Sequence, residues 1–183
     1  MNEVEAVKSV DDIKFISSLL NKHGGEIYSD IWSFGINTAL RISDLLSIRM
    51  ETLTSNTLTL KEAKTGKTRV ITLNGPAQEV IRRRQQSYPS DVYLFQAKAN
   101  RAAAEKPVDR STVARKFKEI GEIVKIPLGT HSMRKTRGYQ MYRSGVQIEK
   151  ICKVLNHSTP SMTLRYIGIE KQDIQDTYTD FEL

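Results

Sequence analysis

Apolar residues recur at helical spacing along most of this chain, and this pattern constrains its fold more than any other feature. Helices are expected over residues 9–22, 28–38, 41–48, 77–86, 111–125, 131–144 and 147–155, with another that begins at Pro160. The turn at residues 64–67 (Lys-Thr-Gly-Lys) instead separates two β-prone stretches, which predict two short strands within residues 57–73. The sequence therefore predicts a mainly α-helical (α+β) fold with one small antiparallel β-hairpin.

Residues that favour helix ends support these boundaries. Pro76 and Pro160 suit the first turn of a helix, where the missing N–H of proline costs nothing. Ser111 is a candidate N-cap, because its hydroxyl could accept a backbone N–H of the first turn. Thr130 could cap the following helix in the same way.

The length and charge of the chain suit one globular domain with an acidic partner. A chain of 183 residues is long enough to bury a core, and it contains no internal repeat or low-complexity tract. Its 28 Lys and Arg outnumber its 21 Asp and Glu, which gives a formal net charge of +7. This balance favours nucleic acid as a partner, because Lys and Arg bind phosphates. Charge alone does not establish DNA binding, because a basic protein need not contact DNA.

A reducing, cytoplasmic location is expected. Cys152 is the only cysteine, so the chain has no internal disulfide, and its helical spacing with Ile148, Ile151 and Leu155 predicts a buried apolar side chain. No apolar run is long enough to span a membrane, and the N-terminus lacks the apolar core of a signal peptide.

Four residues in the C-terminal third carry the most chemical information. His131 and Arg134 lie three residues apart, which places them on one face of a helix, where they could bind one small anion together. His157 follows in a Leu-Asn-His-Ser stretch, and Tyr166 comes nine residues later with a hydroxyl that could attack phosphorus. This set is typical of phosphoryl transfer without a metal or other cofactor.

Two upstream segments extend the set. Arg41 lies in a Thr-Ala-Leu-Arg-Ile-Ser stretch, and Lys64 precedes Thr-Gly in the predicted hairpin. The order Arg, Lys, His-x-x-Arg, His, Tyr resembles the catalytic set of the tyrosine recombinases, or phage integrase family, and the resemblance runs from about residue 11 to residue 180. It implies the catalytic-domain fold of that family and double-stranded DNA as partner. It also implies a monomer when free and a homotetramer on DNA.

The resemblance also implies a role for each residue. Tyr166 would attack a DNA phosphodiester and form a 3′-phosphotyrosine, while His131 assists removal of its proton. Arg41, Arg134 and His157 would stabilise the charge on the non-bridging oxygens, because guanidinium groups match phosphate geometry. Lys64 would protonate the departing 5′-oxygen. The chain departs from the family pattern at Lys135, where a second histidine commonly follows the arginine.

Structural readings of these residues remain open at this level. Arg41 could form a salt bridge with Asp44, and either histidine could be a hydrogen-bonded structural residue. Lys64 could be a solvated turn lysine, with Lys61 and Lys67 as neighbours of the same type. Other candidates of uncertain role are the two tyrosines after Arg134 and a run of three arginines, namely Tyr139, Tyr142, Arg82, Arg83 and Arg84.

Residues 1–183 are interpreted as a single catalytic domain that lacks the N-terminal DNA-clamping domain of most family members. A natural short recombinase is favoured over a fragment of a longer integrase. Residues 167–183 carry an apolar stripe among acidic residues and are expected to form a docking tail. A non-catalytic DNA-binding regulator and a type IB topoisomerase are the alternative functions. The target DNA sequence, and the choice between integration, excision and inversion, are left open.

Overall fold

The structure, a computed structural model, describes residues 4–98, 105–169 and 178–179. Its helices and its single pair of strands follow one another along the described chain as α1 (Val10–Gly24), α2 (Glu26–Thr38), α3 (Ile42–Leu46), the 3₁₀ turn η1 (Met50–Thr52), β1 (Thr57–Lys61), β2 (Thr68–Thr72), α4 (Gly75–Ser87), α5 (Arg110–Val124), α6 (Ser132–Arg143), α7 (Ile148–Leu155) and α8 (Pro160–Ile167). The predicted α+β class with a small antiparallel sheet is confirmed.

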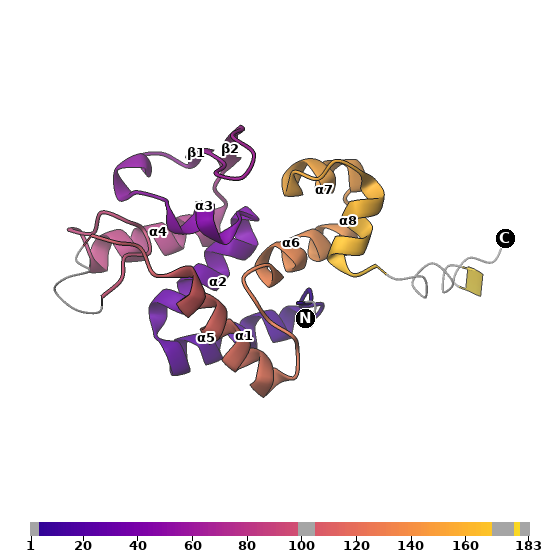
Figure 1. The fold of residues 1–183 in the computed structure, drawn as a ribbon, viewed down its shortest axis with the longest axis horizontal. Helices are drawn as coiled ribbons and strands as arrows, with labels where there is room; N and C mark the ends of the chain where they lie inside the picture. The colour runs from indigo at the N-terminus through magenta and orange to yellow at the C-terminus, as the bar shows by residue number, and fades with distance from the viewer. Residues whose placement is uncertain (1–3, 99–104, 170–177, 180–183) are drawn as a thin grey trace.

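The larger hydrophobic core surrounds α2, which packs against α1, α4 and α6 (Figure 1). Trp32 and Phe34 of α2 are almost fully buried there. Trp32 meets Phe117 of α5 edge to face, with ring centroids 5.4 Å apart, an arrangement that aromatic quadrupoles favour. The N-terminal two-thirds of the chain thus forms the body on which the site is built.

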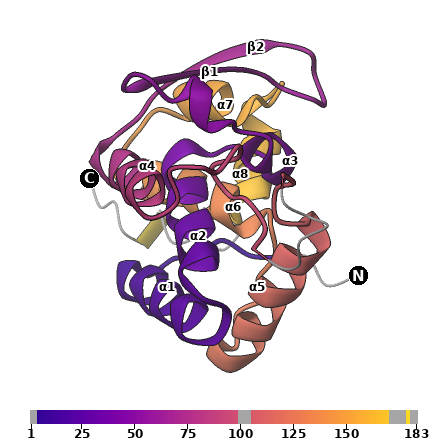
Figure 2. The ribbon, with the colours of Figure 1, turned by 90° about the vertical axis from the view of Figure 1, so that its left-hand side faces the viewer.

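A smaller core joins α6, α7 and α8. Its buried members include Tyr139, Ile151, Leu155 and Ile167. Gly138 of α6 lets α7 and α8 approach closely, since a Cβ there would lie 2.7 Å from Ile167 Cγ2. In Figures 1 and 2 the hairpin and α7 lie at the same end of the molecule, with α1 and α5 at the other.

The hairpin is attached to α3 through a buried carboxylate. Thr57 pairs with Thr72 and Lys61 with Thr68, which defines the antiparallel register. Asp44 Oδ1 of α3 accepts the backbone N–H of residue 63 at 2.9 Å, just before the turn that carries Lys64. The orientation of this turn therefore depends on α3.

Two predicted helix caps are wrong, and the prolines are in their predicted places. Asp109, not Ser111, caps α5: it directly precedes the helix and its carboxylate accepts the Ser111 N–H at 2.8 Å, whereas Ser111 lies within the first turn. His131, not Thr130, occupies the N-cap of α6, without a side-chain capping bond. Pro76 and Pro160 lie in the first turns of α4 and α8. Across the described residues, no helix has the length and apolar character that crossing a membrane requires.

Candidate active site

Tyr166 and His131 meet although they come from different helices. Tyr166 lies in the last turn of α8, and its phenol oxygen is 3.2 Å from His131 Nδ1 at the start of α6. Partial burial, together with the charge of Arg134, lowers the pKa of His131, so its ring is neutral at neutral pH. A neutral ring whose Nδ1 is unprotonated is able to accept the tyrosine proton.

His157 lies on the other side of the Tyr166 ring. Their ring centroids are 4.7 Å apart, and Asn156, in the left-handed conformation with a φ of 51°, ends α7 directly before His157. Burial and the charge of Arg134 lower the pKa of His157 to about 4. A neutral His157 donates through Nε2 only if Nδ1 carries no proton, and the Thr163 hydroxyl, 3.0 Å from Nδ1, can donate a hydrogen bond to it in that tautomer.

Arg134 is buried beside Tyr166 and connects two helix ends. Its Nη2 donates to the Leu155 carbonyl of α7 at 2.6 Å, and its Nη1 donates to the Ala39 carbonyl at the end of α2. Helix ends leave carbonyls without intrahelical donors, so a cation is favourable there. Burial raises the pKa of Tyr166, but a hydrogen bond and the charge of Arg134 act in the opposite direction.

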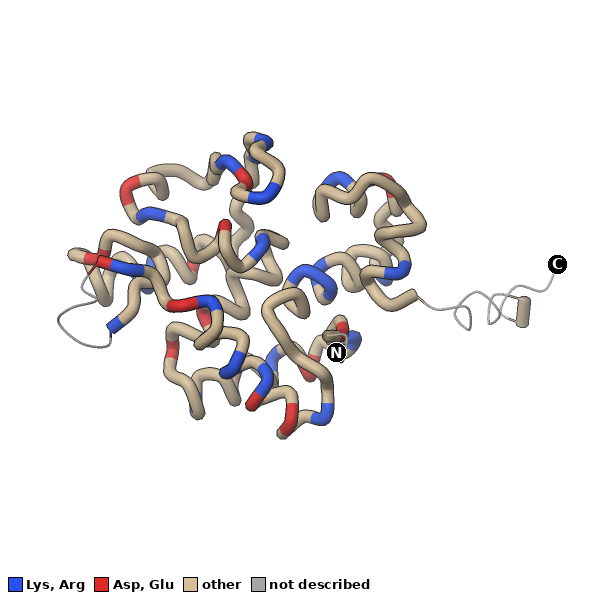
Figure 3. The backbone as a smooth tube through the Cα atoms, in the orientation of Figure 1, with Lys and Arg blue, Asp and Glu red and all other residues tan. Residues whose placement is uncertain are grey.

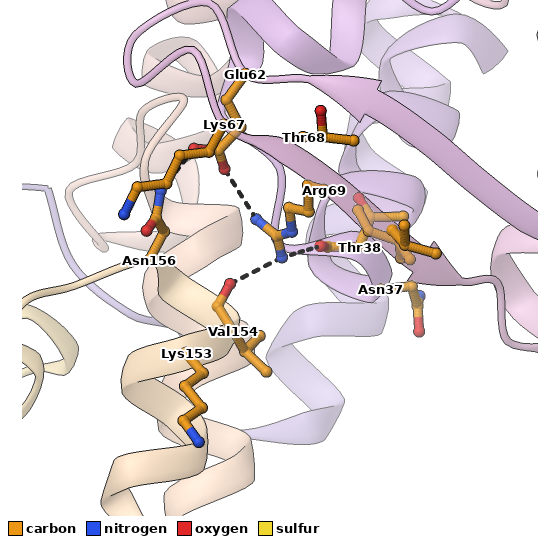
Figure 4. Close-up of a pocket in the computed structure, with 11 residues that line it drawn as sticks. Asn37, Thr38, Glu62, Lys67, Thr68, Arg69, Lys153, Val154 and Asn156 are labelled. Atoms are coloured by element: carbon orange, nitrogen blue, oxygen red, sulfur yellow. Dashed lines mark hydrogen bonds and ion pairs between the residues drawn. The ribbon is translucent and has the colours of Figure 1, made fainter.

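Arg69 makes a second connection of the same kind. Its Nη2 donates to the Val154 carbonyl at 2.8 Å and to the Thr38 carbonyl at 3.3 Å (Figure 4). Arg69 and Arg134 thus bind successive carbonyls at the ends of α2 and α7, and they hold the His157 segment against the body of the protein. Arg69 backs an open cavity of about 440 Å³ between β2 and α7 that Tyr166 does not line.

Arg41 precedes α3 and pairs with an acid other than Asp44, the partner in the alternative structural reading. Arg41 Nη1 donates to Glu62 Oε2 at 2.7 Å. Asp44 is occupied by the hairpin backbone instead. Sequence analysis did not identify Glu62, Arg69 or Asn156 as site residues. The one available signal was an acid, Glu62, between the lysines of a basic hairpin.

Lys64 is not in contact with the other candidates. It is exposed in the turn between β1 and β2, where Figure 3 shows several basic residues, and no hydrogen bond or ion pair to it occurs among the described residues. The structure therefore brings together Tyr166, His131, His157 and Arg134. Arg41 is close enough for its charge to lower the pKa of both histidines.

Comparison with known proteins identifies the relationship. The model of the phage integrase family matches residues 13–173, which is more than half of the chain. The chain belongs to the phage integrase family. The probable integrase/recombinase YoeC of Bacillus subtilis is 33% identical over 184 residues, which cover 99% of this chain and 98% of that protein.

Solved structures show the same fold. The crystal structure of XerA recombinase aligns with a TM-score of 0.74 and 18% identity, over 98% of this chain and 65% of that one. A lambda integrase tetramer bound to a Holliday junction aligns with a TM-score of 0.69 and 15% identity, over 93% of this chain and 51% of that one. This chain thus spans between half and two-thirds of those two structures, and the fold of their catalytic domains is its own.

Lys135, where the chain departs from the family pattern, lies beside Tyr166. Lys135 is buried in α6, and its ammonium lies 5.3 Å from the centroid of the Tyr166 ring. Its charge therefore faces the same tyrosine as the site histidines. The side chain makes a cation–π contact with this ring and, unlike an imidazole, has no nitrogen that can accept a hydrogen bond.

The remaining candidates lie in different environments within the described part of the chain. Tyr139 is buried in the smaller core, whereas Tyr142 is 38% exposed. Arg84 is almost fully buried, donates to the Leu94 carbonyl and stacks on Tyr88, so neither phosphate binding nor a solvated face describes it. No three His, Cys, Asp or Glu side chains among the described residues gather as a possible metal site.

Proposed function

We propose that this chain cuts and rejoins DNA as a site-specific recombinase with Tyr166 as its nucleophile. The observation that carries the proposal is the 3.2 Å approach of the Tyr166 hydroxyl to His131, next to Arg134 and His157. A nucleophile, a neutral base and preorganised cationic donors are the groups that phosphoryl transfer without a metal requires. The known relatives named integrase and recombinase support the same reading.

In the first step, the Tyr166 hydroxyl gives its proton to His131 and its oxygen attacks the phosphorus of a DNA phosphodiester. The bond from phosphorus to the 5′-oxygen breaks, which leaves a 3′-phosphotyrosine. Arg41, Arg134 and His157 stabilise the charge that develops on the non-bridging oxygens. Arg134 suits this role because two carbonyls immobilise its guanidinium and take only two of its five N–H groups.

Lys64 completes the step by protonating the 5′-oxygen as it leaves. Its exposed position at the end of the hairpin suits a group that reaches the DNA only when DNA is bound. The 5′-hydroxyl of a second strand then attacks the phosphotyrosine and reverses the sequence, which joins the strand to a new partner. The relation to lambda integrase, solved as a tetramer on a Holliday junction, supports a tetramer on DNA.

The decisive experiment is covalent trapping on DNA that flanks the locus encoding the chain. A nick next to the cleavage site releases the 5′ fragment, so the 3′-phosphotyrosine adduct should accumulate and be visible on a denaturing gel. Tyr166→Phe should abolish the adduct and retain DNA binding, whereas Tyr142→Phe, which changes an exposed tyrosine, should leave it unchanged. An adduct formed by Tyr166→Phe would assign the nucleophile elsewhere.

The same assay separates the alternatives. A non-catalytic regulator would bind the DNA but form no adduct with any tyrosine. A type IB topoisomerase would form the adduct and relax supercoils without joining two partner sites. Adduct formation in excess EDTA is expected, because side chains supply the positive charge. Loss in EDTA with recovery in Mg²⁺ would indicate a metal-dependent nuclease.

A further inference from the structure

Glu62 lies at the centre of a buried cluster that joins three segments of the site. Only 1% of its side chain is exposed. Its Oε2 accepts hydrogen bonds from Arg41 Nη1 at 2.7 Å, Asn156 Nδ2 at 2.7 Å and Thr65 Oγ1 at 2.8 Å. Its Oε1 accepts a longer bond from Arg69 Nη1 at 3.3 Å. These partners come from the start of α3, the end of α7, the turn that carries Lys64, and β2.

Glu62 is ionised at every pH at which the protein would work. Burial by itself would raise its pKa, but the hydrogen bonds from Thr65, Arg41 and Asn156 lower it to about 2. A buried carboxylate with one proton would lose part of this network, whereas the ionised form accepts from all four partners. The cluster is therefore a constant feature and not a pH switch.

The two arginines bonded to the Glu62 carboxylate differ in how many of their donor atoms already form hydrogen bonds. Both Nη atoms of Arg69 are used, one for Glu62 and the other for the Thr38 and Val154 carbonyls (Figure 4). Arg41 donates only through Nη1, and its Nη2 and Nε make no hydrogen bond within the described residues. Arg69 thus belongs to the fixed frame, while Arg41 presents open donors. One carboxylate between two guanidinium groups also leaves a net positive charge.

We propose that Glu62 is a positioning residue that orients Arg41 for the phosphate and sets the Lys64 turn and the His157 segment in register with it. This proposal rests on the recombinase function proposed above. Glu62 does not touch the phosphate, because its oxygens are buried and occupied. It acts by removing the rotational freedom of Arg41, through a short charge-assisted bond that resists displacement.

Two residues bonded to Glu62 adjoin the reacting groups. Thr65 follows Lys64, and Asn156 precedes His157, so the carboxylate contacts the immediate neighbours of both. A shift of about 1 Å in a catalytic group lowers rates by about a hundredfold. Loss of Glu62 should therefore slow the chemical step more than it weakens the binding of DNA.

The test is the single-turnover rate of adduct formation on nicked DNA with saturating protein. Glu62→Gln keeps the shape of the side chain and removes its charge, and we expect adduct formation at least tenfold slower with DNA affinity within about threefold of the original. Glu79→Gln, an exposed acid paired with Arg82, is the matched control and should change neither value. An unchanged rate in Glu62→Gln would overturn the proposal.

A double-mutant cycle distinguishes positioning from general support of the fold. Because Glu62 orients Arg41, Glu62→Gln should slow adduct formation by a clearly smaller factor in an Arg41→Lys background than in the original protein, and the remaining loss reflects the Lys64 turn and the His157 segment. A full additional loss in that background would show that Glu62 supports the fold independently of Arg41, and would also overturn the proposal.

Glu62→Asp is the second variant, should Glu62→Gln fail to fold. It keeps the charge but withdraws the carboxylate from Arg41, and it should show the same loss of rate. A rate equal to that of the original protein would contradict positioning. If the unaltered protein forms no Tyr166-dependent adduct, the proposed function itself fails, and this outcome is distinct from any change caused by Glu62.

Discussion

At the scale of single residues, Arg41 and Arg134 carry the same charge in two different environments. Arg41 is partly exposed and held by one carboxylate, whereas Arg134 is 2% exposed and held by the carbonyls of Ala39 and Leu155. Removal of either arginine should weaken the stabilisation of the transition state. Arg134 should cost more stability of the fold than Arg41, because its loss leaves two buried acceptors without these donors, whereas Glu62 keeps three other donors when Arg41 is lost.

We therefore expect Arg41→Ala and Arg134→Ala each to lower adduct formation by at least about a hundredfold. DNA affinity should change only modestly, since many other basic residues share the phosphate contacts. Arg134→Ala should in addition lower the free energy of unfolding by about 1–3 kcal/mol for each unpaired carbonyl. Rates, filter binding and thermal denaturation measure the three effects. Affinity that falls as steeply as the rate would make these arginines binding residues.

The pH dependence of cleavage follows from His131. As a base, it must be neutral, and its pKa is lowered from 6.5 by partial burial and then by Arg134. Protonation therefore removes the base only below pH 6.5, so the rate should stay high through pH 6.5 and fall at lower pH. His131→Ala should be about 10²–10⁴-fold slower and lack this inflection. A half-maximal rate at or above pH 6.5 would argue against His131 as the base.

At the scale of elements, the distance between α6 and α8 decides where Tyr166 lies. Both His131 and Arg134 come from α6, so the nucleophile approaches them only if α8 packs closely. Gly138 permits this contact: an added Cβ would lie 2.7 Å from Ile167 Cγ2 and 2.9 Å from Leu155 Cδ1. Ile167 is next to Tyr166 in the chain, so a side chain added at Gly138 that displaces Ile167 should also displace Tyr166.

Gly138→Ala should therefore lower the free energy of unfolding by about 1–3 kcal/mol through overpacking. It should also slow adduct formation by about tenfold or more, because the phenol moves away from His131. Gly75→Ala is the control, since a Cβ there meets nothing within 4 Å. Calorimetry and the trapping assay report the two effects. A Gly138→Ala protein with the original stability and rate would show that α8 repacks freely.

At the scale of the whole molecule, the expected docking tail lies mostly outside the described residues. Tyr178, one of the few described residues in it, is 77% exposed. In the sequence, Ile174, Tyr178 and Phe181 fall on one helical face among acids, which would be a poor DNA contact in a protein of net charge +7. We propose that this tail binds an apolar surface of a neighbouring protomer on DNA.

Deletion of residues 171–183 should leave cleavage of a single site measurable, because the proposed catalytic side chains all precede it. Synapsis and strand exchange should be impaired, since the contact between protomers is lost. Gel-shift analysis of synaptic complexes and a two-site recombination assay measure these outcomes. Unfolding of the truncated monomer would indicate instead that the tail covers its own core.

Local features of the fold could be predicted from the sequence because their causes are local. Helical periodicity, the Lys-Thr-Gly-Lys turn and the prolines of α4 and α8 depend on near neighbours, and the structure agrees with each of them. The caps of α5 and α6 were misplaced because several nearby polar residues compete for one helix end. The order of the basic residues, the histidines and Tyr166 also sufficed to identify the phage integrase family.

The sequence by itself thus determined the elements, the family and the candidate catalytic residues. Only the tertiary structure decided that Glu62 binds Arg41 and Asn156, the latter 94 positions away, and that Arg69 joins the ends of α2 and α7. Periodicity specifies which face of a helix is buried, but not which distant group a buried charge will meet. That choice depends on how the helices pack, because a buried carboxylate is stable only where packing brings donors to it.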